Sequence, residues 1–433
     1  MLKKLEEKIL DKKAKVGVIG LGYVGLPLAL TFVKGGFRVY GIDIDKNKVA
    51  KLKTGKSHIL DVSPQEIKDA LKEGLVVSAD FSRIKELDAV IICVPTPLYK
   101  TKEPDVSYIV AAVEKIKRYM KRGQIVILES TTYPGTTEEV MLPVLESNGW
   151  KEGEDFYLAF SPERIDPGNP RYQTKNTPKV IGGISQRSTQ IAKLLYEQVL
   201  DAVIPVSSAK VAEMVKLLEN TFRIVNIGLV NEIMLMCDRL CINVWEVIDA
   251  ARTKPYGFMP FYPGPGVGGH CIPVDPLYLS WKARMYGFEA RFIDLASYVN
   301  SEMPRYVVSK IISGLNEHGK PLKCANILMM GVAYKKDVKD LRESPALEII
   351  ELLVENGAIV SYYDPYFPYL KIRDINLKSA PFDKESFTDS DCVVIITDHS
   401  DVDYKFVVKN SKLVVDTRNI LKDIKDRSNI VRI

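Results

Sequence analysis

The chain has 433 residues, more than a single hydrophobic core usually holds, so two or three domains are expected. Apolar residues make up 46% of it and charged residues 27%, the composition of an ordinary globular protein. The net charge of +5 comes from 60 basic and 55 acidic residues that are well mixed along the chain. This balance gives no reason to expect a nucleic-acid partner, and no apolar run is long enough to predict a membrane span.

The cysteines and the N-terminus indicate the cellular setting. Residues 1–8 carry charges at helical spacing and lack the apolar centre of a signal peptide. The six cysteines contain no CxxC pair, which favours reduced thiols over a disulfide framework or a zinc site. We therefore expect a cytoplasmic protein without a bound metal. The cysteines are Cys93, Cys237, Cys241, Cys271, Cys324 and Cys392.

The first 200 or so residues alternate strand and helix patterns, which predicts a parallel sheet covered by helices. An apolar run over 14–19 leads into Gly20-Leu-Gly-Tyr-Val-Gly25, a helical run follows, and the next strand ends at Asp43. The glycines let the backbone approach a pyrophosphate at a helix N-terminus, and the carboxylate can bind ribose hydroxyls. The alternative is a glycine-rich turn without a ligand. The flanking strand and helix favour a dinucleotide site, with NAD preferred because an acid repels the 2′-phosphate of NADP.

Two later strands end in hydroxyl-bearing residues. The runs 89–94 and 125–128 are followed by Thr96 and Thr131, respectively. Since ligands of open α/β sheets lie beyond the carboxyl ends of the strands, both threonines can reach the cofactor.

Ser161-Pro-Glu-Arg164 is a polar turn in which Glu163 and Arg164 are neighbours. Most such pairs are surface ion pairs of little consequence. The functional interpretation is a carboxylate that activates water beside an arginine that contacts the substrate.

Residues 209–240 have the pattern of one long helix. Glu213, Lys216, Asn220 and Arg223 follow one another at helical spacing and form a polar stripe between apolar flanks. The commoner explanation is the wet face of a surface helix. Because the segment stays apolar to its end, we expect a buried helix instead, in which Lys216 serves as a base or oxyanion stabiliser.

The loop 261–275 is rich in glycine and proline and presents Cys271, with His270 before it and Asp275 after it. A cysteine on a rigid glycine-lined loop beside ionisable groups is what covalent catalysis at a carbonyl requires. The alternative is a structural loop with a buried, inert thiol.

After further helical sequence to about residue 318, the strand and helix alternation restarts without a GxGxxG motif. The first new strand runs into a segment rich in phosphate-binding donors, from Tyr334 to Ser344. We predict an α/β protein with two Rossmann-like doubly wound domains joined by a long central helix. The expected domains are residues 1–205 for the dinucleotide, 206–320 for the central helices and thiol loop, and 321–433 for a second nucleotide.

In combination, these motifs resemble the UDP-glucose/GDP-mannose dehydrogenase family of nucleotide-sugar 6-dehydrogenases. The resemblance covers essentially the whole chain and includes Lys216-Leu-Leu-Glu-Asn-Thr-Phe-Arg223 and Gly264-Pro-Gly-Val-Gly-Gly-His-Cys271. It implies an NAD-dependent oxidation of the sugar C6 alcohol to a carboxylate in two steps, a UDP-binding C-terminal domain, and a homodimer or higher homo-oligomer. It also implies a role in making polysaccharide or glycan precursors.

The resemblance assigns roles to individual residues. The implied catalytic residues are Cys271, Lys216, Asn220, Asp275 and Glu163. The implied NAD contacts are Gly20, Gly22, Tyr23, Val24, Gly25, Asp43, Lys48, Thr96, Thr131 and Arg342. The implied UDP-sugar contacts are Arg164, Ile165, Lys216, Asn220, Arg223, Gly268, Tyr334, Lys335 and Arg418.

The nature of the sugar follows from the same resemblance. His270 and the run 253–263 are similar to the N-acetylhexosamine branch, so UDP-N-acetylglucosamine is the expected substrate. UDP-N-acetylmannosamine, UDP-N-acetylgalactosamine and UDP-glucose stay open. A β-hydroxyacid dehydrogenase would need neither the thiol loop nor residues 321–433, and an idle nucleotide-binding protein would have no reason to keep all five catalytic residues.

Overall fold

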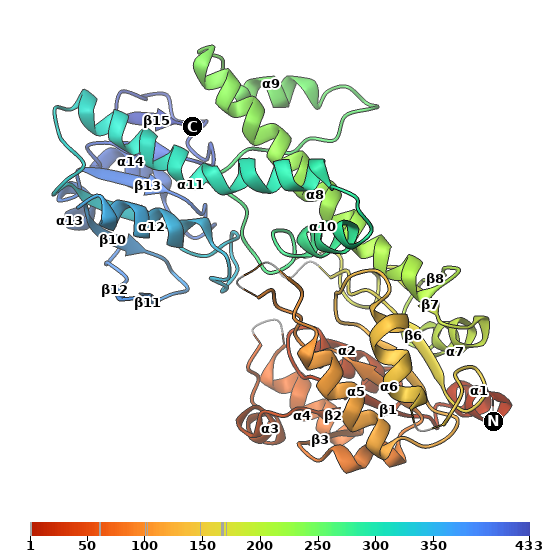
Figure 1. Cartoon of the computed structure of the whole chain (residues 1–433). Coiled ribbons are helices and arrows are strands. Elements are labelled where there is room, and N and C mark those ends of the chain that lie inside the picture. Colours follow the sequence, from red (N-terminus) through yellow and green to blue (C-terminus); the bar gives the residue numbers. More distant parts are fainter. Residues whose placement is uncertain are drawn as a thin grey trace. The chain divides into compact units, whose positions relative to one another are not determined.

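The computed structural model describes residues 2–59, 62–99, 101, 103–147, 149–165, 169 and 171–433. It contains two compact units, residues 1–219 with 277–288 and residues 220–276 with 289–433 (Figure 1). The division falls within helix α8 (Ala209–Arg239). Each unit has its own largely parallel sheet with helices, so the predicted α/β class is confirmed. The finer division into three domains stays a prediction.

The sheet of the first unit has the strand order β3-β2-β1-β4-β5-β6-β7-β8. The neighbours from β3 to β6 pair in parallel, and β7 runs antiparallel to β6. Because β1 lies between β2 and β4, the loops after β1 and β4 meet at the carboxyl edge, where such sheets bind ligands. The strands are β1 (Lys15–Ile19), β2 (Arg38–Ile42), β3 (Leu75–Ser78), β4 (Ala89–Ile92), β5 (Ile125–Leu128), β6 (Tyr157–Phe160), β7 (Lys179–Gly183) and β8 (Val203–Pro205).

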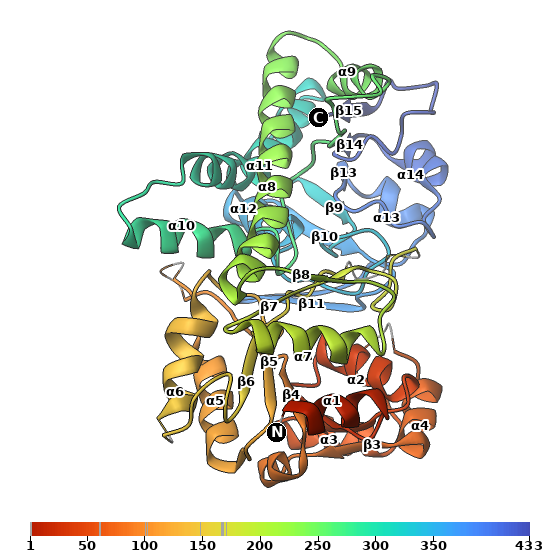
Figure 2. The ribbon, with the colours of Figure 1, turned by 90° about the vertical axis from the view of Figure 1, so that its right-hand side faces the viewer.

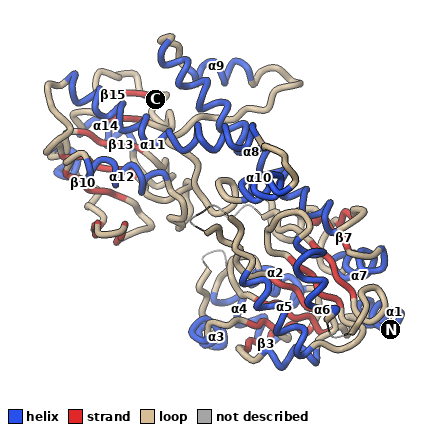
Figure 3. Tube along the Cα trace, in the orientation of Figure 1, coloured by secondary structure: helices blue, strands red, loops and turns tan. Residues whose placement is uncertain are grey.

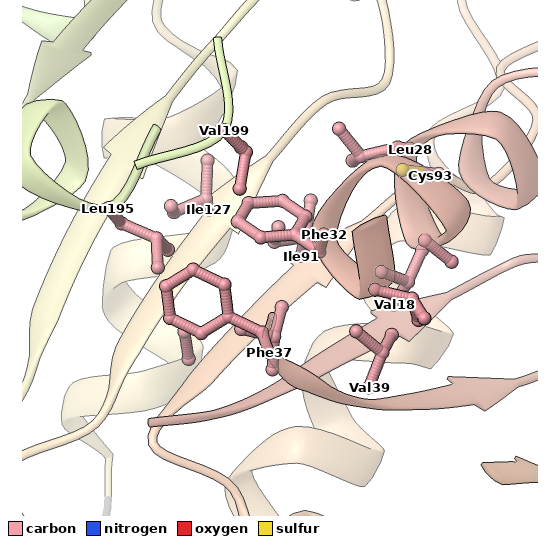
Figure 4. Packing of buried hydrophobic residues seen from close by; sticks show 14 of the residues in the cluster. Val18, Leu28, Phe32, Phe37, Val39, Ile91, Cys93, Ile127, Leu195 and Val199 are labelled. Atoms are coloured by element: carbon pink, nitrogen blue, oxygen red, sulfur yellow. The ribbon is translucent and has the colours of Figure 1, made fainter. Parts of the chain in front are cut away.

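Helices cover both faces of this sheet (Figure 3). On one face the rings of Phe32 and Phe37 pack edge to face, with centroids 5.8 Å apart, among residues such as Ile91, Ile127 and Leu195 (Figure 4). This face carries α1 (Leu2–Leu10), α2 (Gly25–Lys34), α3 (Lys46–Lys53), α4 (Pro64–Glu73) and α7 (Gln186–Glu197). The other face carries η1 (Phe81–Glu86), α5 (Ser107–Tyr119), η2 (Thr137–Met141) and α6 (Leu142–Glu146).

The second unit contains a five-stranded parallel sheet in the order β10-β9-β13-β14-β15 (Figure 2). Its strands are β9 (Asn326–Met330), β10 (Ile359–Tyr363), β13 (Cys392–Ile395), β14 (Val414–Asp416) and β15 (Ile430–Arg432), beside a hairpin of β11 (Tyr369–Ile372) and β12 (Ile375–Lys378). One face packs on α11 (Arg291–Glu317) and α12 (Pro345–Glu355), the other on α13 (Lys384–Thr388) and α14 (Tyr404–Asn410). Helix α9 (Val244–Ala251) joins the first of these cores, and α10 spans Asp275–Met285.

Helix α8 confirms the predicted long helix but corrects the expected burial. Glu213, Lys216 and Asn220 are buried as expected, whereas Arg223 is exposed. The apolar flanks are not enclosed, and Leu218 is 59% exposed. Glu213 and Asn220 are buried because they have partners within the protein. Among the apolar residues, Leu217 is buried while several others face outward. The exposed apolar residues of α8 are Val211, Met214, Leu218, Phe222, Leu229 and Met236.

Candidate active site

The glycines of the first loop have different physical roles. Gly20 adopts φ +90°, which favours glycine, and a Cβ at Gly25 would lie 1.9 Å from the Gly20 carbonyl oxygen. A Cβ at Gly22 would meet nothing within 4 Å. The backbone conformation and close packing therefore account for the glycines at positions 20 and 25. Gly22 has no such constraint, and its lack of a side chain leaves the N-terminus of α2 uncovered. This arrangement fits a pyrophosphate group, which a helix N-terminus attracts.

Asp43 directly follows β2 and is held beside this loop. Its carboxylate accepts hydrogen bonds from the N–H of Leu21 at 2.8 Å and of Asp45 at 2.9 Å, and from Lys48 Nζ at 2.9 Å. Although burial raises the pKa of Asp43, these contacts lower it below its usual range. The ionised carboxylate fits the ribose of an adenine dinucleotide, and Lys48 is held at the same place.

The loops that carry the two predicted threonines are joined to each other. Ser130 Oγ, which precedes Thr131, donates to the carbonyl oxygen of Val94 at 2.6 Å. The carbonyl oxygen of Thr96 accepts a hydrogen bond from the Tyr278 hydroxyl. Both loops therefore belong to one connected edge of the first sheet, next to the loop after β1.

Glu163 belongs to a buried cluster of charged groups. Lys179 Nζ lies 2.9 Å from one oxygen of Glu129 and 3.2 Å from one oxygen of Glu163. The hydroxyl of Tyr196 donates to the other oxygen of Glu129. Lys179 is only 5% exposed, so this cation is shared between two carboxylates out of contact with most of the solvent.

The cluster fixes the ionisation of Glu163. Its other oxygen accepts the N–H groups of Arg164 and Ile165, both at 2.7 Å. Burial raises the pKa of Glu163. The opposing effects of Lys179, the Ile165 N–H and Lys216 outweigh burial, so the pKa lies below its usual range. Glu163 is thus an anion at neutral pH, and the positive charge of Lys216 acts on it.

Arg164 and Glu213 attach neighbouring loops to α8 within the first unit. The guanidinium of Arg164 pairs with both oxygens of Glu219, at 2.6 and 3.2 Å. One oxygen of Glu213 accepts the N–H of Thr137 at 2.9 Å and its hydroxyl at 2.7 Å. These contacts hold the helix turn that carries Lys216 between the Glu163 turn and the loop after β5.

The thiol loop belongs to the second unit and is anchored at its start and its end. The Gly264 N–H donates to Asn231 Oδ1 at 3.0 Å, and the Asp275 N–H donates to the carbonyl oxygen of Cys271 at 2.8 Å. Asp275 is buried, and Asn220 Nδ2 donates to its carboxylate at 2.5 Å. Two predicted catalytic side chains therefore meet directly beside the backbone of Cys271.

The same loop packs against the segment that follows β9. A Cβ at Gly268 would lie 2.6 Å from Tyr334 Cβ, and one at Gly264 would lie 2.7 Å from an Arg418 nitrogen. The Gly269 N–H donates to the carbonyl oxygen of Arg342 at 3.0 Å. At Gly268, glycine is thus required for close approach between the loop and Tyr334, one of the predicted UDP-sugar contacts.

The remaining predicted residues have these positions. Tyr23 and Val24 precede α2, and Lys335 follows Tyr334. Arg342 lies in the second unit, where its guanidinium pairs with Asp340 at 2.6 Å, and its place near the cofactor stays a prediction. The predicted UDP-sugar contacts are divided, with Arg164, Ile165 and Lys216 in the first unit and the others in the second.

The six cysteines, all within the described residues, differ in their setting. Burial raises the pKa of the thiols of Cys93 and Cys392, which disfavours their reactive thiolate forms. Cys237 is buried, and Cys241 and Cys324 are exposed. Cys271 is half-buried on its anchored loop, the setting that a nucleophile needs.

Sequence reasoning missed several residues that shape the site: Lys179, Glu129, Asn231, Asn300, Asp364 and His399. One signal was present, because Asp364 follows an apolar strand as Asp43 does. Another was the lysine that opens the apolar run Lys179-Val-Ile-Gly-Gly183. The partners of the two asparagines come from distant segments and have no local signal.

The chain matches three family models along its length. Residues 14–200 match the NAD binding domain of the UDP-glucose/GDP-mannose dehydrogenase family, residues 210–302 its central domain and residues 328–423 its UDP binding domain. None of the helices within the described residues is long and apolar enough to cross a membrane.

Similar proteins agree with this match. A UDP-N-acetyl-D-mannosamine dehydrogenase of Methanococcus maripaludis is 36% identical over 94% of this chain and 93% of its own. A UDP-N-acetyl-D-glucosamine 6-dehydrogenase of Pseudomonas aeruginosa is 39% identical over 82% and 83%. The solved UDP-D-ManNAc dehydrogenase of Pyrococcus horikoshii has a TM-score of 0.89 at 35% identity, with 97% of this chain and 99% of that one covered. The chain therefore belongs to the UDP-glucose/GDP-mannose dehydrogenase family and is an NAD-dependent nucleotide-sugar dehydrogenase.

Proposed function

We propose that the protein oxidises the C6 alcohol of a UDP-N-acetylhexosamine to the carboxylate, with Cys271 as covalent nucleophile. The observation that carries the proposal is the contact of Asn220 with Asp275, beside the backbone of Cys271. A buried amide and carboxylate at a cysteine loop provide the polar groups that acyl chemistry needs. NAD, when bound at the loop after β1, accepts the hydride that C6 loses in each oxidation.

The residues of the chain divide the work as follows. After the alcohol has become an aldehyde, Cys271 Sγ adds to the carbonyl carbon and gives a thiohemiacetal. Loss of a second hydride and a proton gives a thioester, which water cleaves to the acid and the free thiol. Lys216 and Asn220 stabilise the charge that builds on the C6 oxygen, and the Glu163 carboxylate assists the attacking water.

UDP-N-acetylglucosamine is the proposed substrate, and UDP-N-acetylmannosamine is the second candidate. The run that precedes the thiol loop and the 39% identity to the Pseudomonas aeruginosa enzyme support the first sugar. The relatives from Methanococcus and Pyrococcus, which match nearly the whole chain, support the second. An NADH assay with both sugars, UDP-N-acetylgalactosamine and UDP-glucose distinguishes them by kcat/KM.

The variant Cys271→Ser tests the covalent step. We expect it to bind NAD normally but to form no uronic acid, because a serine hydroxyl here lacks an evident base to make it comparably nucleophilic. Product is measured by mass spectrometry and NAD binding by titration. Acid formation at near the wild-type rate would rule out the thioester.

We also propose that the protein forms a homodimer or a higher homo-oligomer. The exposed apolar residues of α8 and the outward side chains of α11, among them Phe292 at 77% exposure, support this proposal. Sedimentation of the wild type against Phe292→Asp tests it, since a charge in an apolar interface should release monomers.

A further inference from the structure

Asp364 occupies in the second unit the place that Asp43 has in the first. Each directly follows the second strand of its sheet. Each carboxylate accepts the N–H of a residue in the loop after the first strand, from Val332 at 2.7 Å and from Leu21 at 2.8 Å, respectively. The side-chain partners differ, because Asp364 faces the imidazole of His399, with Nε2 3.1 Å from its Oδ2.

The hydrogen bonds of His399 determine its tautomer. The backbone N–H of Asp337 donates to Nδ1 at 3.0 Å, so Nδ1 carries no proton. Nε2 therefore carries the proton and donates a hydrogen bond to the Asp364 carboxylate. The ring is 1% exposed, and the edge of Tyr366 packs on it with the centroids 5.0 Å apart. His399 is thus a fixed bridge between the residue after β10 and the loop after β9.

The hydrogen bond from the Asp337 N–H to His399 stabilises a backbone segment, residues 333–337, that has an unfavourable conformation at Asp337. Asp337 adopts φ +57°, a conformation that non-glycine residues rarely take. Its carboxylate accepts the Ser400 N–H at 2.8 Å and the Ser400 hydroxyl at 2.6 Å, next to the His399 contact. Thr397 Oγ1 also donates to the carbonyl oxygen of Ala333 at 2.6 Å. The segment 397–400 therefore holds the segment 333–337 at several points.

The two segments lie at the point of the second sheet where ligands are expected. Strand β9 pairs in parallel with β10 on one side and with β13 on the other, so the order in which successive strands join the sheet reverses between β9 and β13. Open α/β sheets bind ligands beyond the carboxyl ends of the strands at such a reversal. Tyr334 and Lys335, two of the proposed UDP contacts, lie in the loop that follows β9.

We propose that His399 is a positioning residue for UDP binding. Held by Asp364, it fixes the Asp337 N–H and thereby the course of the segment that presents Tyr334 and Lys335 to the nucleotide. The inference rests on the proposed function, in which these two residues contact UDP. His399 touches no ligand in this account and acts through the backbone.

Asparagine and leucine make a matched pair of replacements for His399, because they have similar shapes and only asparagine offers an acceptor to the Asp337 N–H. UDP and NAD are titrated separately into the full-length wild type, His399→Leu and His399→Asn by calorimetry. We expect His399→Leu to bind UDP about tenfold more weakly, the effect of one lost buried hydrogen bond, and to keep its NAD affinity. His399→Asn should stay within about threefold of the wild type because the acceptor is kept.

Unchanged UDP affinity in His399→Leu would overturn the inference. So would an equal loss of NAD affinity, or an asparagine variant no better than the leucine variant, since either result indicates a general structural role. If His399→Leu does not fold, Ser400→Ala replaces it, because Ser400 is exposed and its hydroxyl only supports Asp337. A drop of about threefold for UDP alone is then expected, and no drop overturns the inference. Absence of UDP binding by the wild type would instead overturn the proposed function, and with it this inference.

Discussion

At the scale of single residues, the cluster around Lys179 determines how Glu163 behaves. One buried cation serves the buried carboxylate of Glu129 and the partly buried carboxylate of Glu163, and the hydroxyl of Tyr196 stabilises the charge on Glu129 by a hydrogen bond. Removing one partner of a buried ion pair leaves charge without compensation, which is more damaging than the pair is stabilising. The cluster therefore ties the stability of the fold to the ionisation of a proposed catalytic group.

We predict that Lys179→Met shifts the acid limb of the kcat profile to higher pH. Lys179 keeps the pKa of Glu163 low, so without it the pKa rises and the carboxylate is lost at a higher pH. The pH dependence of kcat is compared with that of Lys175→Met, a control at an exposed lysine of the same segment. An unshifted limb in Lys179→Met would mean that Lys179 does not control Glu163.

At the scale of elements, local sequence predicted well what depends on neighbours along the chain. The strand, glycine turn, helix and Asp43 of the first unit arise from one continuous segment. Helix α8 and the alternation of strands and helices in the second unit likewise follow from local patterns. Burial on α8 was predicted correctly for Glu213, Lys216 and Asn220. It was predicted wrongly for Arg223 and Leu218, because periodicity gives the faces of a helix but not which face the rest of the protein covers. The partners of Lys179 and His399 could not be predicted, since they come from separate strands and loops.

The anchoring of the thiol loop on two helices gives a prediction at this scale. Asn231 of α8 donates to Asn300 of α11 at 2.8 Å and accepts the Gly264 N–H, and both asparagines are buried. Asn231→Leu leaves these groups unsatisfied and should destabilise the protein by about 1–3 kcal/mol. It should also lower kcat, since the loop that carries Cys271 loses its anchor.

The control is Asn226→Leu on the same helix, where the amide only bonds to the carbonyl oxygen of Phe222. Thermal unfolding and turnover are measured for both variants. A loss of kcat in the control as large as that in Asn231→Leu would contradict a specific role for the loop anchor.

At the scale of the whole molecule, two sheets of similar construction serve two nucleotides. The first has the open glycine turn and the ionised Asp43, and the second has a loop of cationic residues after β9 and matches a UDP binding domain. Mutations beside the first sheet should therefore change the affinity for NAD, and mutations beside the second sheet should change the affinity for UDP.

We predict that Asp43→Asn weakens NAD binding and reduces the discrimination against NADP, while UDP affinity is unchanged. Lys335→Ala should weaken UDP by about 1.5–3 kcal/mol, as a lost charge-assisted hydrogen bond, and leave NAD affinity unchanged. Lys336→Ala, the exposed neighbour, is the control and should bind both ligands normally. If Lys335→Ala lost NAD affinity rather than UDP affinity, the assignment of the two sheets would be wrong.

The stoichiometry of the complete reaction distinguishes oxidation to the carboxylate from a single oxidation of the sugar. The wild-type protein is given a limiting amount of UDP-N-acetylhexosamine with excess NAD, and NADH is measured by absorbance and the sugar by mass spectrometry. We expect two NADH per sugar consumed, with a product that has gained one oxygen and lost two hydrogens at C6. One NADH per sugar, with the aldehyde or a ketone as final product, would contradict oxidation to the acid through Cys271.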